Sequence, residues 1–561
     1  MAAVFRPQLV CREFELGFLK RLIETSNDIS TQSHHIINFF SGVSQMFLKS
    51  HFATLYFYPE MNGSSNGKVI SFPNKNESNV TLEKWYFPLL VKEVPNTELK
   101  KFQKLIEDKY NQYFDSYWSF HKWSVKNFPD FWKEVWHYFK IISSTPYDQV
   151  FVKTGDGFLD NEWFRGAAFN LAENIMRIRD SRIGLICCDE FGNRETITYA
   201  EIYEQTKLYT AAFRKHGLKV GDRVAYYISN IKESLFAMLA TISIGAIWGG
   251  PLPYHGPKIA SSIMKEIDPK FIISVDHFQA CGEQHYPIEN LSVIAKDLPN
   301  LEKVIIVATR KETFSLDVSD IPNCILLDDF LQSGMTADGV VPDLIFEQLP
   351  FNHPTIINFT SGTTGTPKGV VHAAGTIIAQ LRDFSLHLNL KEGDIVYSNS
   401  PVGWAAFDYL IPNLALGVTL LFFNGSPEYV GEFTFWDVLA QNKVSFAFLP
   451  SAYVNSFQTD CILPKPDTNL ESLKILGLAG SPVRPQDYKF LLSNIKSDLL
   501  ILSLYGATEV VGAFSGSDLN SPFHACECQV PSLGNSVLGK RGEVVVTKPN
   551  PSLPIYLWKD Q

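Results

Sequence analysis

The segment Asn358–Gly369, which reads NFTSGTTGTPKG, combines small, hydroxyl-bearing and cationic residues in a pattern suited to binding phosphate. Such a loop leaves backbone N–H groups free to surround a polyphosphate, while hydroxyl groups add donors and Lys368 adds a positive charge. The nucleotide P-loop has Gly directly before its Lys, whereas Thr366 and Pro367 stand there in this chain, so this is a different phosphate loop. The alternative interpretation is a polar surface loop. The predicted nucleotide ligands in the loop are Thr360, Ser361, Gly362, Thr363, Thr364, Gly365 and Lys368.

Two further segments place polar groups directly after predicted strands. Leu499–Leu504 is an apolar run typical of a buried strand, and Tyr505–Glu509 follows it with a hydroxyl group and a carboxylate. Leu476–Pro482 predicts a strand that ends in a Gly-Ser-Pro turn. A carboxylate that acts together with a phosphate loop suits a hard divalent cation, which prefers carboxylate and phosphate oxygens.

The phosphate loop requires elements that hold it in place. Thr355–Phe359, a β-branched and aromatic run, predicts a buried strand before the loop. After the loop, Val370–Ala374 and the apolar positions that follow it, up to Leu381, predict a helix. His372 falls at the start of this helix, and ordinary packing is a better interpretation of it than catalysis.

Taken in order, these three elements resemble the signatures of the adenylate-forming, or AMP-binding, enzymes, a family that includes the acyl-CoA synthetases. In that family the Thr of the second element contacts the α-phosphate region and its Glu holds Mg²⁺. The resemblance therefore implies catalytic roles for Lys368, Thr508 and Glu509, with Glu509 as the metal ligand. It also implies that the Gly-Ser-Pro turn lines the adenine. The implied nucleotide-binding residues outside the loop are Gly480, Ser481, Pro482, Tyr505, Gly506, Ala507 and Thr508.

Other local strings resemble the acetyl- and acetoacetyl-CoA synthetase branch of this family. The resemblance covers roughly residues 95–561 and includes Trp123–Trp136, Trp163–Asn174, Ile321–Phe330, Glu347–Pro354 and Thr547–Pro554. It implies a two-step reaction with ATP, Mg²⁺ and CoA. A carboxylate attacks the α-phosphorus of ATP to give an acyl-adenylate and pyrophosphate, and the CoA thiol then displaces AMP. Positioning and charge neutralisation carry most of such catalysis.

The acyl group accepted is expected to depend on residue size. Acetate-activating relatives place two tryptophans where this chain has Tyr505 and Gly506, and the second tryptophan closes the acyl pocket. Glycine there leaves room for acetoacetate or another short acid, since each methylene changes discrimination by only ~1–3 kcal/mol. The predicted acyl-binding residues are Trp404, Ala405, Ala406, Gly480 and Gly506.

The family pattern continues beyond Gln561, where this sequence ends. The resemblance implies a further element whose Asp binds the ribose hydroxyls, then a hinge and a small C-terminal domain that carries a catalytic lysine. From the sequence as it stands we expect a poor or inactive synthetase. The alternative is a non-catalytic protein, a paralogue or truncated isoform, that binds nucleotide or a partner on the same scaffold.

Strands that alternate with helices predict an α/β fold, a large domain of parallel and mixed sheets flanked by helices. Examples are the strands predicted at Lys270–Val275 and Lys303–Ala308 and the helix at Glu233–Ile244. The resemblance adds a partial β-barrel region and implies that the small C-terminal domain is absent. We expect an unmatched extension over residues 1–94 with a flexible loop at 61–79, a synthetase-type segment over 95–175 and the AMP-binding large domain over 176–561.

Composition argues against several other classes of protein. A net charge of −10 without a Lys/Arg stripe argues against nucleic-acid binding, so the expected partners are a small carboxylate, ATP and CoA. The eight cysteines lack zinc or disulfide spacing, which predicts reduced thiols in a cytoplasmic protein, and Cys526 and Cys528 are interpreted in the same way. The apolar runs Ser234–Pro251 and Tyr409–Phe423 predict buried helix-and-strand segments rather than membrane spans. The oligomeric state stays open.

Overall fold

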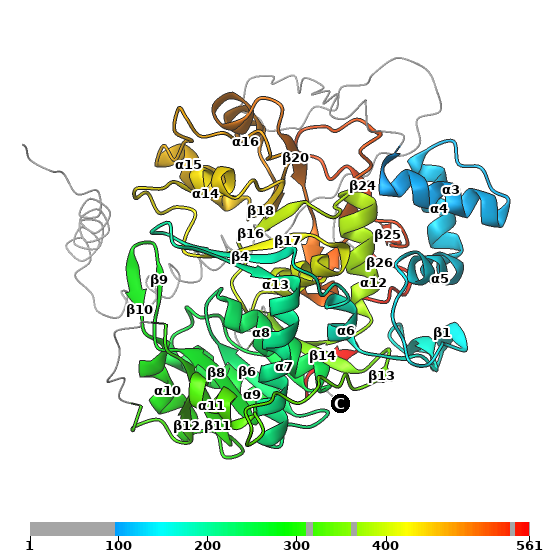
Figure 1. Cartoon of the computed structure of the whole chain (residues 1–561). Helices are drawn as coiled ribbons and strands as arrows, with labels where there is room; N and C mark the ends of the chain where they lie inside the picture. Colours follow the sequence, from blue (N-terminus) through cyan, green and yellow to red (C-terminus); the bar gives the residue numbers. More distant parts are fainter. Residues whose placement is uncertain (1–95, 310–317, 361–366, 539–544, 560–561) are drawn as a thin grey trace, which may run out of the picture. The chain divides into compact units, whose positions relative to one another are not determined.

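The computed structural model describes residues 96–309, 318–360, 367–538 and 545–559, all within one compact unit, Leu55–Gln561. Two large sheets organise this part of the chain (Figure 1). The eight-stranded sheet has the order β12-β11-β8-β6-β7-β14-β15-β27. Neighbours from β12 to β14 are parallel, whereas β15 and β27 are antiparallel to their neighbours. Its strands are β6 (Arg223–Tyr227), β7 (Ile247–Gly249), β8 (Phe271–Val275), β11 (Lys303–Val307), β12 (Cys324–Leu326), β14 (Pro354–Thr360), β15 (Lys368–Ala373) and β27 (Tyr556–Leu557).

The seven-stranded sheet has the order β20-β19-β18-β16-β17-β4-β5. All neighbours from β20 to β4 are parallel, and β5 is antiparallel to β4. Its strands are β4 (Ile183–Asp189), β5 (Arg194–Thr198), β16 (Ile395–Ser398), β17 (Thr419–Asn424), β18 (Phe446–Pro450), β19 (Ile475–Ala479) and β20 (Leu500–Ser503). The predicted α/β class with parallel and mixed sheets is therefore confirmed.

Helices cover the faces of both sheets, as parallel strands require. Those between the strands are α6 (Leu171–Ile175), α7 (Tyr199–Lys215), α8 (Lys232–Ser243), α9 (Pro257–Ile267), α10 (Pro287–Lys296), α11 (Leu327–Ser333), α12 (Thr376–Leu381), α13 (Ala405–Leu410), α14 (Phe435–Gln441), α15 (Ala452–Thr459) and α16 (Pro485–Phe490). The capping box of α7, in which Thr198 and Glu201 bond each other's backbone N–H groups, shows how the sequence starts such a helix.

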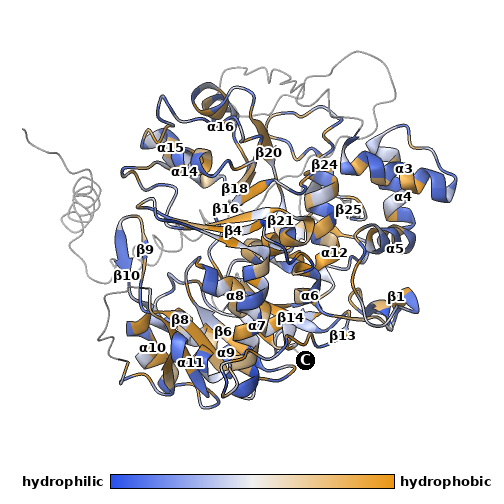
Figure 2. Cartoon of the chain, viewed as in Figure 1, coloured by the Kyte–Doolittle hydropathy of each residue, from blue (hydrophilic) through white to orange (hydrophobic). Residues whose placement is uncertain are grey.

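Side chains that alternate along a strand enter different cores. In β20, Leu500 and Leu502 belong to the largest core, which also includes residues of α7 and α8, while Ile501 faces the core under α14 and α16. In β6, Val224 faces the largest core and Ala225 faces the core under α9 and α10. Burial on both faces explains why these strands are continuous apolar runs, which lie inside the fold in Figure 2.

An aromatic helical segment precedes the sheets. Three helices, α3 (Glu98–Tyr110), α4 (Tyr117–Lys126) and α5 (Phe128–Tyr138), pack through rings such as Phe102, Phe120 and Phe131, all of them buried. The segment Trp123–Trp136 spans two helices: α4 ends at Lys126, and Asn127 is both its C-cap residue and the N-cap residue of α5, whose first turn contains Pro129.

Short strand pairs complete the described part of the chain. They are β1 (Gln149–Lys153) with β2 (Asn161–Arg165), β3 (Ala168–Phe169) with β13 (Leu349–Pro350), β9 (Phe278–Ala280) with β10 (Glu283–His285), β21 (Gly506–Ala507) with β22 (Gly512–Ala513), β23 (Ser515–Gly516) with β24 (Val530–Pro531) and β25 (Val537–Leu538) with β26 (Val545–Val546). The prediction of a partial β-barrel is wrong for the described residues, because the short strands from β21 to β26 form separate two-stranded pairs.

The remaining predictions concern single segments of the chain. Ser234–Pro251 and Tyr409–Phe423 contain a buried helix followed by a buried strand, as predicted, and within the described ranges no helix is long and apolar enough to cross a membrane. The predicted helix directly after the phosphate loop is wrong at its start, because residues 368–373 form strand β15 and the helix begins only at Thr376. The predicted extension over residues 1–94, with its loop at 61–79, lies outside the described residues.

Candidate functional site

The phosphate loop connects two antiparallel neighbours, β14 and β15, with Thr360 paired to Lys368 across the ladder. The predicted ligands Ser361, Gly362, Thr363, Thr364 and Gly365 lie outside the described residues. Lys368 is exposed at the start of β15 and forms no ion pair with any described residue, so its charge is available to a ligand. Gly369 is needed behind it, because a Cβ there would lie 3.0 Å from both Ile357 Cγ2 and Trp558 Cβ.

The Tyr505–Glu509 element forms a tight hairpin beside this loop. Gly506–Ala507 pairs with Gly512–Ala513, and a 3₁₀ turn at Thr508–Val510 fills the bend. This turn contacts both β14 and β15. Lys368, Thr508 and Glu509, which are 140 residues or more apart across the two elements, thus belong to contacting elements, as the family signatures require.

His372 lies behind the turn rather than in the site. Its side chain is fully buried on β15, with the backbone of Thr508 beside the ring. Burial lowers the pKa of the imidazole from 6.5 to about 3, so the ring is neutral. A packing role for His372 agrees with this position, although it belongs to a strand and not to a helix.

The Gly-Ser-Pro turn leaves the strand next to the one that carries Tyr505. β19 and β20 are parallel neighbours, and the Leu504 backbone N–H donates to the Leu478 carbonyl at 2.8 Å. Both turns therefore project from the carboxyl ends of adjacent strands, the edge at which open α/β sheets bind ligands. Gly480 has φ of +89°, a conformation that favours glycine, and Ser481 bonds Ser451 through its hydroxyl at 2.6 Å.

Glu509, the predicted metal ligand, is accessible to a divalent cation. Its carboxylate is exposed and forms no ion pair or hydrogen bond with other described residues, and with burial it raises the pKa of Tyr505. No cluster of three His, Cys, Asp or Glu residues that could hold a metal occurs within the described ranges. One carboxylate fits Mg²⁺ bound to a nucleotide, because this ion is commonly held by one or two carboxylates, substrate phosphates and water.

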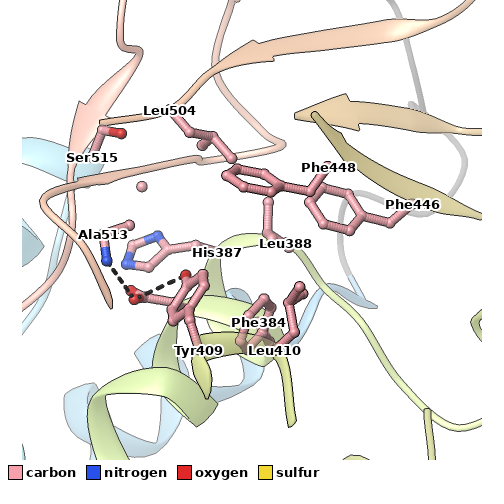
Figure 3. A pocket seen from close by; sticks show the side chains of 12 residues that line it. Phe384, His387, Leu388, Tyr409, Leu410, Phe446, Phe448, Leu504, Ala513 and Ser515 are labelled. Carbon is pink, nitrogen blue, oxygen red and sulfur yellow. Dashed lines mark hydrogen bonds between the residues drawn. The ribbon is translucent and has the colours of Figure 1, made fainter. Parts of the chain in front are cut away.

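The predicted acyl-binding residues lie at the surface of this region. Trp404 is the N-cap residue of α13 and is 46% exposed, and Ala405 and Ala406 are partly buried behind it. Packing within the hairpin explains why residue 506 is glycine, since a Cβ there would lie 2.5 Å from the Gly512 carbonyl oxygen on the opposite strand. A small cavity next to the hairpin is lined by other residues, among them Phe384, Tyr409, Phe448, Leu504 and Ala513 (Figure 3).

Several buried polar residues near the site were not predicted from the sequence, because they belong to no recognisable motif. Gln380, Asp383 and Asp408 are each about 2% exposed, and Asp408 has an oxygen, Oδ2, without a hydrogen-bond partner among the described residues. Burial raises the pKa of Asp408 from 3.8 to about 7. The only signal in the sequence is the presence of amide and carboxylate side chains inside apolar helical runs. The seven described cysteines are free thiols, in agreement with the prediction.

The sequence of this chain matches known protein families and individual relatives. Residues 179–552 match the family model described as AMP-binding enzyme, and residues 117–175 match the acetyl-coenzyme A synthetase N-terminus. The chain is 34% identical over 481 residues to an acetoacetyl-CoA synthetase of Gallus gallus, covering 83% of this chain and 72% of the relative. An acetoacetyl-coenzyme A synthetase of Rhizobium meliloti (strain 1021) is 30% identical, with 83% and 73% covered.

A solved structure agrees with these matches. The acetoacetyl-CoA synthetase from Streptomyces lividans superposes with a TM-score of 0.76 at 27% identity, covering 84% of this chain and 73% of that one. Fold and sequence therefore lead to the same assignment, and this chain belongs to the AMP-binding enzyme family.

Proposed function

We propose that this chain activates a short carboxylic acid, acetoacetate or an acid of similar size, with ATP and transfers the acyl group to CoA. The observation that carries the proposal is the contact of the Thr508–Glu509 turn with the two strands that flank the phosphate loop. The names of the relatives, acetoacetyl-CoA synthetases from a vertebrate and a bacterium, support the choice of acid.

Charged and polar side chains of the two motifs would bind different parts of the magnesium-bound nucleotide. The Lys368 ammonium and the N–H groups of the loop would bind the β- and γ-phosphates, and the Thr508 hydroxyl would orient the α-phosphate for in-line attack by the carboxylate. Glu509 would hold Mg²⁺, which when bound supplies neutralisation of the charge on the phosphates. The turn from Gly480 to Pro482 would support the adenine at the neighbouring strand end.

Acyl selection is proposed to depend on the edge of α13. Trp404 offers an exposed indole and the alanines that follow offer little bulk, which suits a small acid at an accessible edge. Because a methylene group changes discrimination by only ~1–3 kcal/mol, a series of acids is needed to identify the preferred one.

The test is carboxylate-dependent exchange of pyrophosphate into ATP by the purified chain, with acetate, acetoacetate, butyrate and hexanoate. Lys368→Ala and Glu509→Gln should each lower exchange by at least about a hundredfold, the range for loss of one electrostatic group at a reacting phosphate. Lys489→Ala and Glu204→Gln change exposed side chains without ion pairs among the described residues and should have no effect. Calorimetric binding of ATP with Mg²⁺ but no exchange with any acid would favour a non-catalytic nucleotide-binding protein.

A further inference from the structure

Two buried side chains on the helix after the phosphate loop reach across to the Thr508–Glu509 hairpin. Gln380 lies in α12, and Asp383 follows three residues later, at the start of a π-helical segment, Arg382–His387. Residues three apart share one side of a helix, so both can face the same neighbour. Both side chains are about 2% exposed, which makes their hydrogen bonds costly to lose.

Both contacts are made to the part of the hairpin that follows its tip, Thr508–Val510. The Gln380 amide Nε2 donates to the Val511 carbonyl at 3.1 Å, and Val511 is the left-handed residue that closes the turn, with φ of 37°. The Ala513 backbone N–H donates to Asp383 Oδ2 at 3.2 Å. Ala513 pairs with Gly506 across the hairpin, so these two bonds anchor the strand that follows Thr508 and Glu509.

The Asp383 carboxylate also accepts hydrogen bonds from two other side chains. Its Oδ1 accepts from the Arg382 guanidinium at 2.6 and 3.0 Å, and Arg382 Nη1 donates to the Leu533 carbonyl at 2.6 Å. The Tyr409 hydroxyl, on α13, donates to Asp383 Oδ2 at 3.2 Å (Figure 3). Asp383 therefore joins the helical segment after the phosphate loop, the hairpin and α13, which carries Ala405 and Ala406.

The helix that carries both side chains has little freedom relative to Lys368. Only Ala374 and Gly375 separate β15 from α12, and their backbone N–H groups bond the carbonyls of His353 and Phe351 at 3.1 and 3.3 Å. A short, hydrogen-bonded connection thus joins the strand that begins at Lys368 to the side chains at 380 and 383, and these side chains bond the hairpin.

We propose that Gln380 and Asp383 are positioning residues that hold the Thr508–Glu509 turn against the Lys368 strand and so determine the affinity for magnesium-bound nucleotide. Neither side chain touches substrate in this proposal. It rests on the proposed function only for the nucleotide, and its test is a binding measurement that needs no turnover.

The test measures the dissociation constant for ATP by calorimetry, once with Mg²⁺ and once with EDTA. Gln380→Met keeps side-chain length without a donor, and Asp383→Asn keeps shape without charge. Each should weaken ATP binding about tenfold in Mg²⁺ and less than twofold in EDTA, because the metal ligand loses its position while the loop remains. The double variant should weaken binding by less than the product of the single effects, since either loss already frees the hairpin.

Matched controls come from α15 and α16, on the other face of the seven-stranded sheet. Gln458 Nε2 donates to Asp487 Oδ1 at 3.0 Å, and Asp487 pairs with Arg484 at 2.8 Å. Gln458→Met and Asp487→Asn therefore remove the same kinds of group and should leave both dissociation constants unchanged. If Asp383→Asn does not fold, Tyr409→Phe replaces it, because this change deletes one hydrogen bond to Asp383 and keeps the ring.

The outcomes separate this proposal from the proposed function. Folded variants with unchanged magnesium dependence, or with equal weakening in Mg²⁺ and EDTA, overturn the positioning roles. Selective weakening without any carboxylate-dependent exchange by the parent chain supports the positioning roles and overturns the enzyme. A parent chain that does not bind ATP with Mg²⁺ overturns both proposals.

Discussion

Replacing Gly506 by alanine separates two explanations for this glycine, room for a longer acyl group and close packing within the hairpin. The structure supports packing, since the new Cβ would lie 2.5 Å from the Gly512 carbonyl oxygen, well inside van der Waals contact. The obstacle is backbone, which cannot rotate away as a side chain could. Overpacking of this kind costs about 1–3 kcal/mol.

The strain should displace the strands on both sides of Thr508 and Glu509. We therefore expect Gly506→Ala to lower the thermal unfolding midpoint and to lower exchange by a similar factor with acetate, acetoacetate and hexanoate. Gly256→Ala is the matched control, because its φ is −64° and a Cβ there would meet nothing within 4 Å. An unchanged midpoint together with a selectivity shift toward acetate would refute the packing explanation and restore the acyl one.

Three further predictions concern stability. Trp558→Phe deletes the indole N–H bond to the Glu266 carbonyl, which is 2.7 Å long, and should cost about 0.5–1.5 kcal/mol and speed amide hydrogen exchange in β27. Because burial lowers the folded pKa of His372 from 6.5 to about 3, the unfolded chain gains this proton first as pH falls. His372 should therefore contribute a loss of stability of about 1.4 kcal/mol per pH unit below pH 6.5, and His372→Leu should reduce the slope seen in thermal melts by that amount. Burial raises the pKa of Asp408 from 3.8 to about 7, so the folded state loses stability as pH rises through this interval. Asp408→Asn should therefore stabilise the protein by up to about 4 kcal/mol at pH 8 and not at pH 4. Equal effects of this substitution at both pH values would contradict this account.

The strands that position the site were predictable because their signal is local. Thr355–Phe359 is a β-branched and aromatic run and Leu499–Leu504 is an apolar run; they form β14 and β20, in which consecutive residues are buried. The same reasoning failed at Val370–Ala374, where an apolar run fits either a buried strand or a buried helix. This run is a strand because it pairs with β14 on one side and with β27 on the other. The second pairing could not be predicted locally, because β27 lies more than 180 residues away.

The sequence by itself determined the elements of chemistry, a glycine-rich phosphate loop with its lysine and a Thr-Glu pair after a buried strand, because their residue types and order suffice to predict them. Tertiary structure alone decided how these elements are held together. Gln380 meets Val511 and Asp383 meets Ala513 across about 130 residues of chain, and no local pattern encodes either contact. The physical reason is burial: a polar group inside a core must find a partner, and which backbone group it finds depends on how the sheets and helices pack.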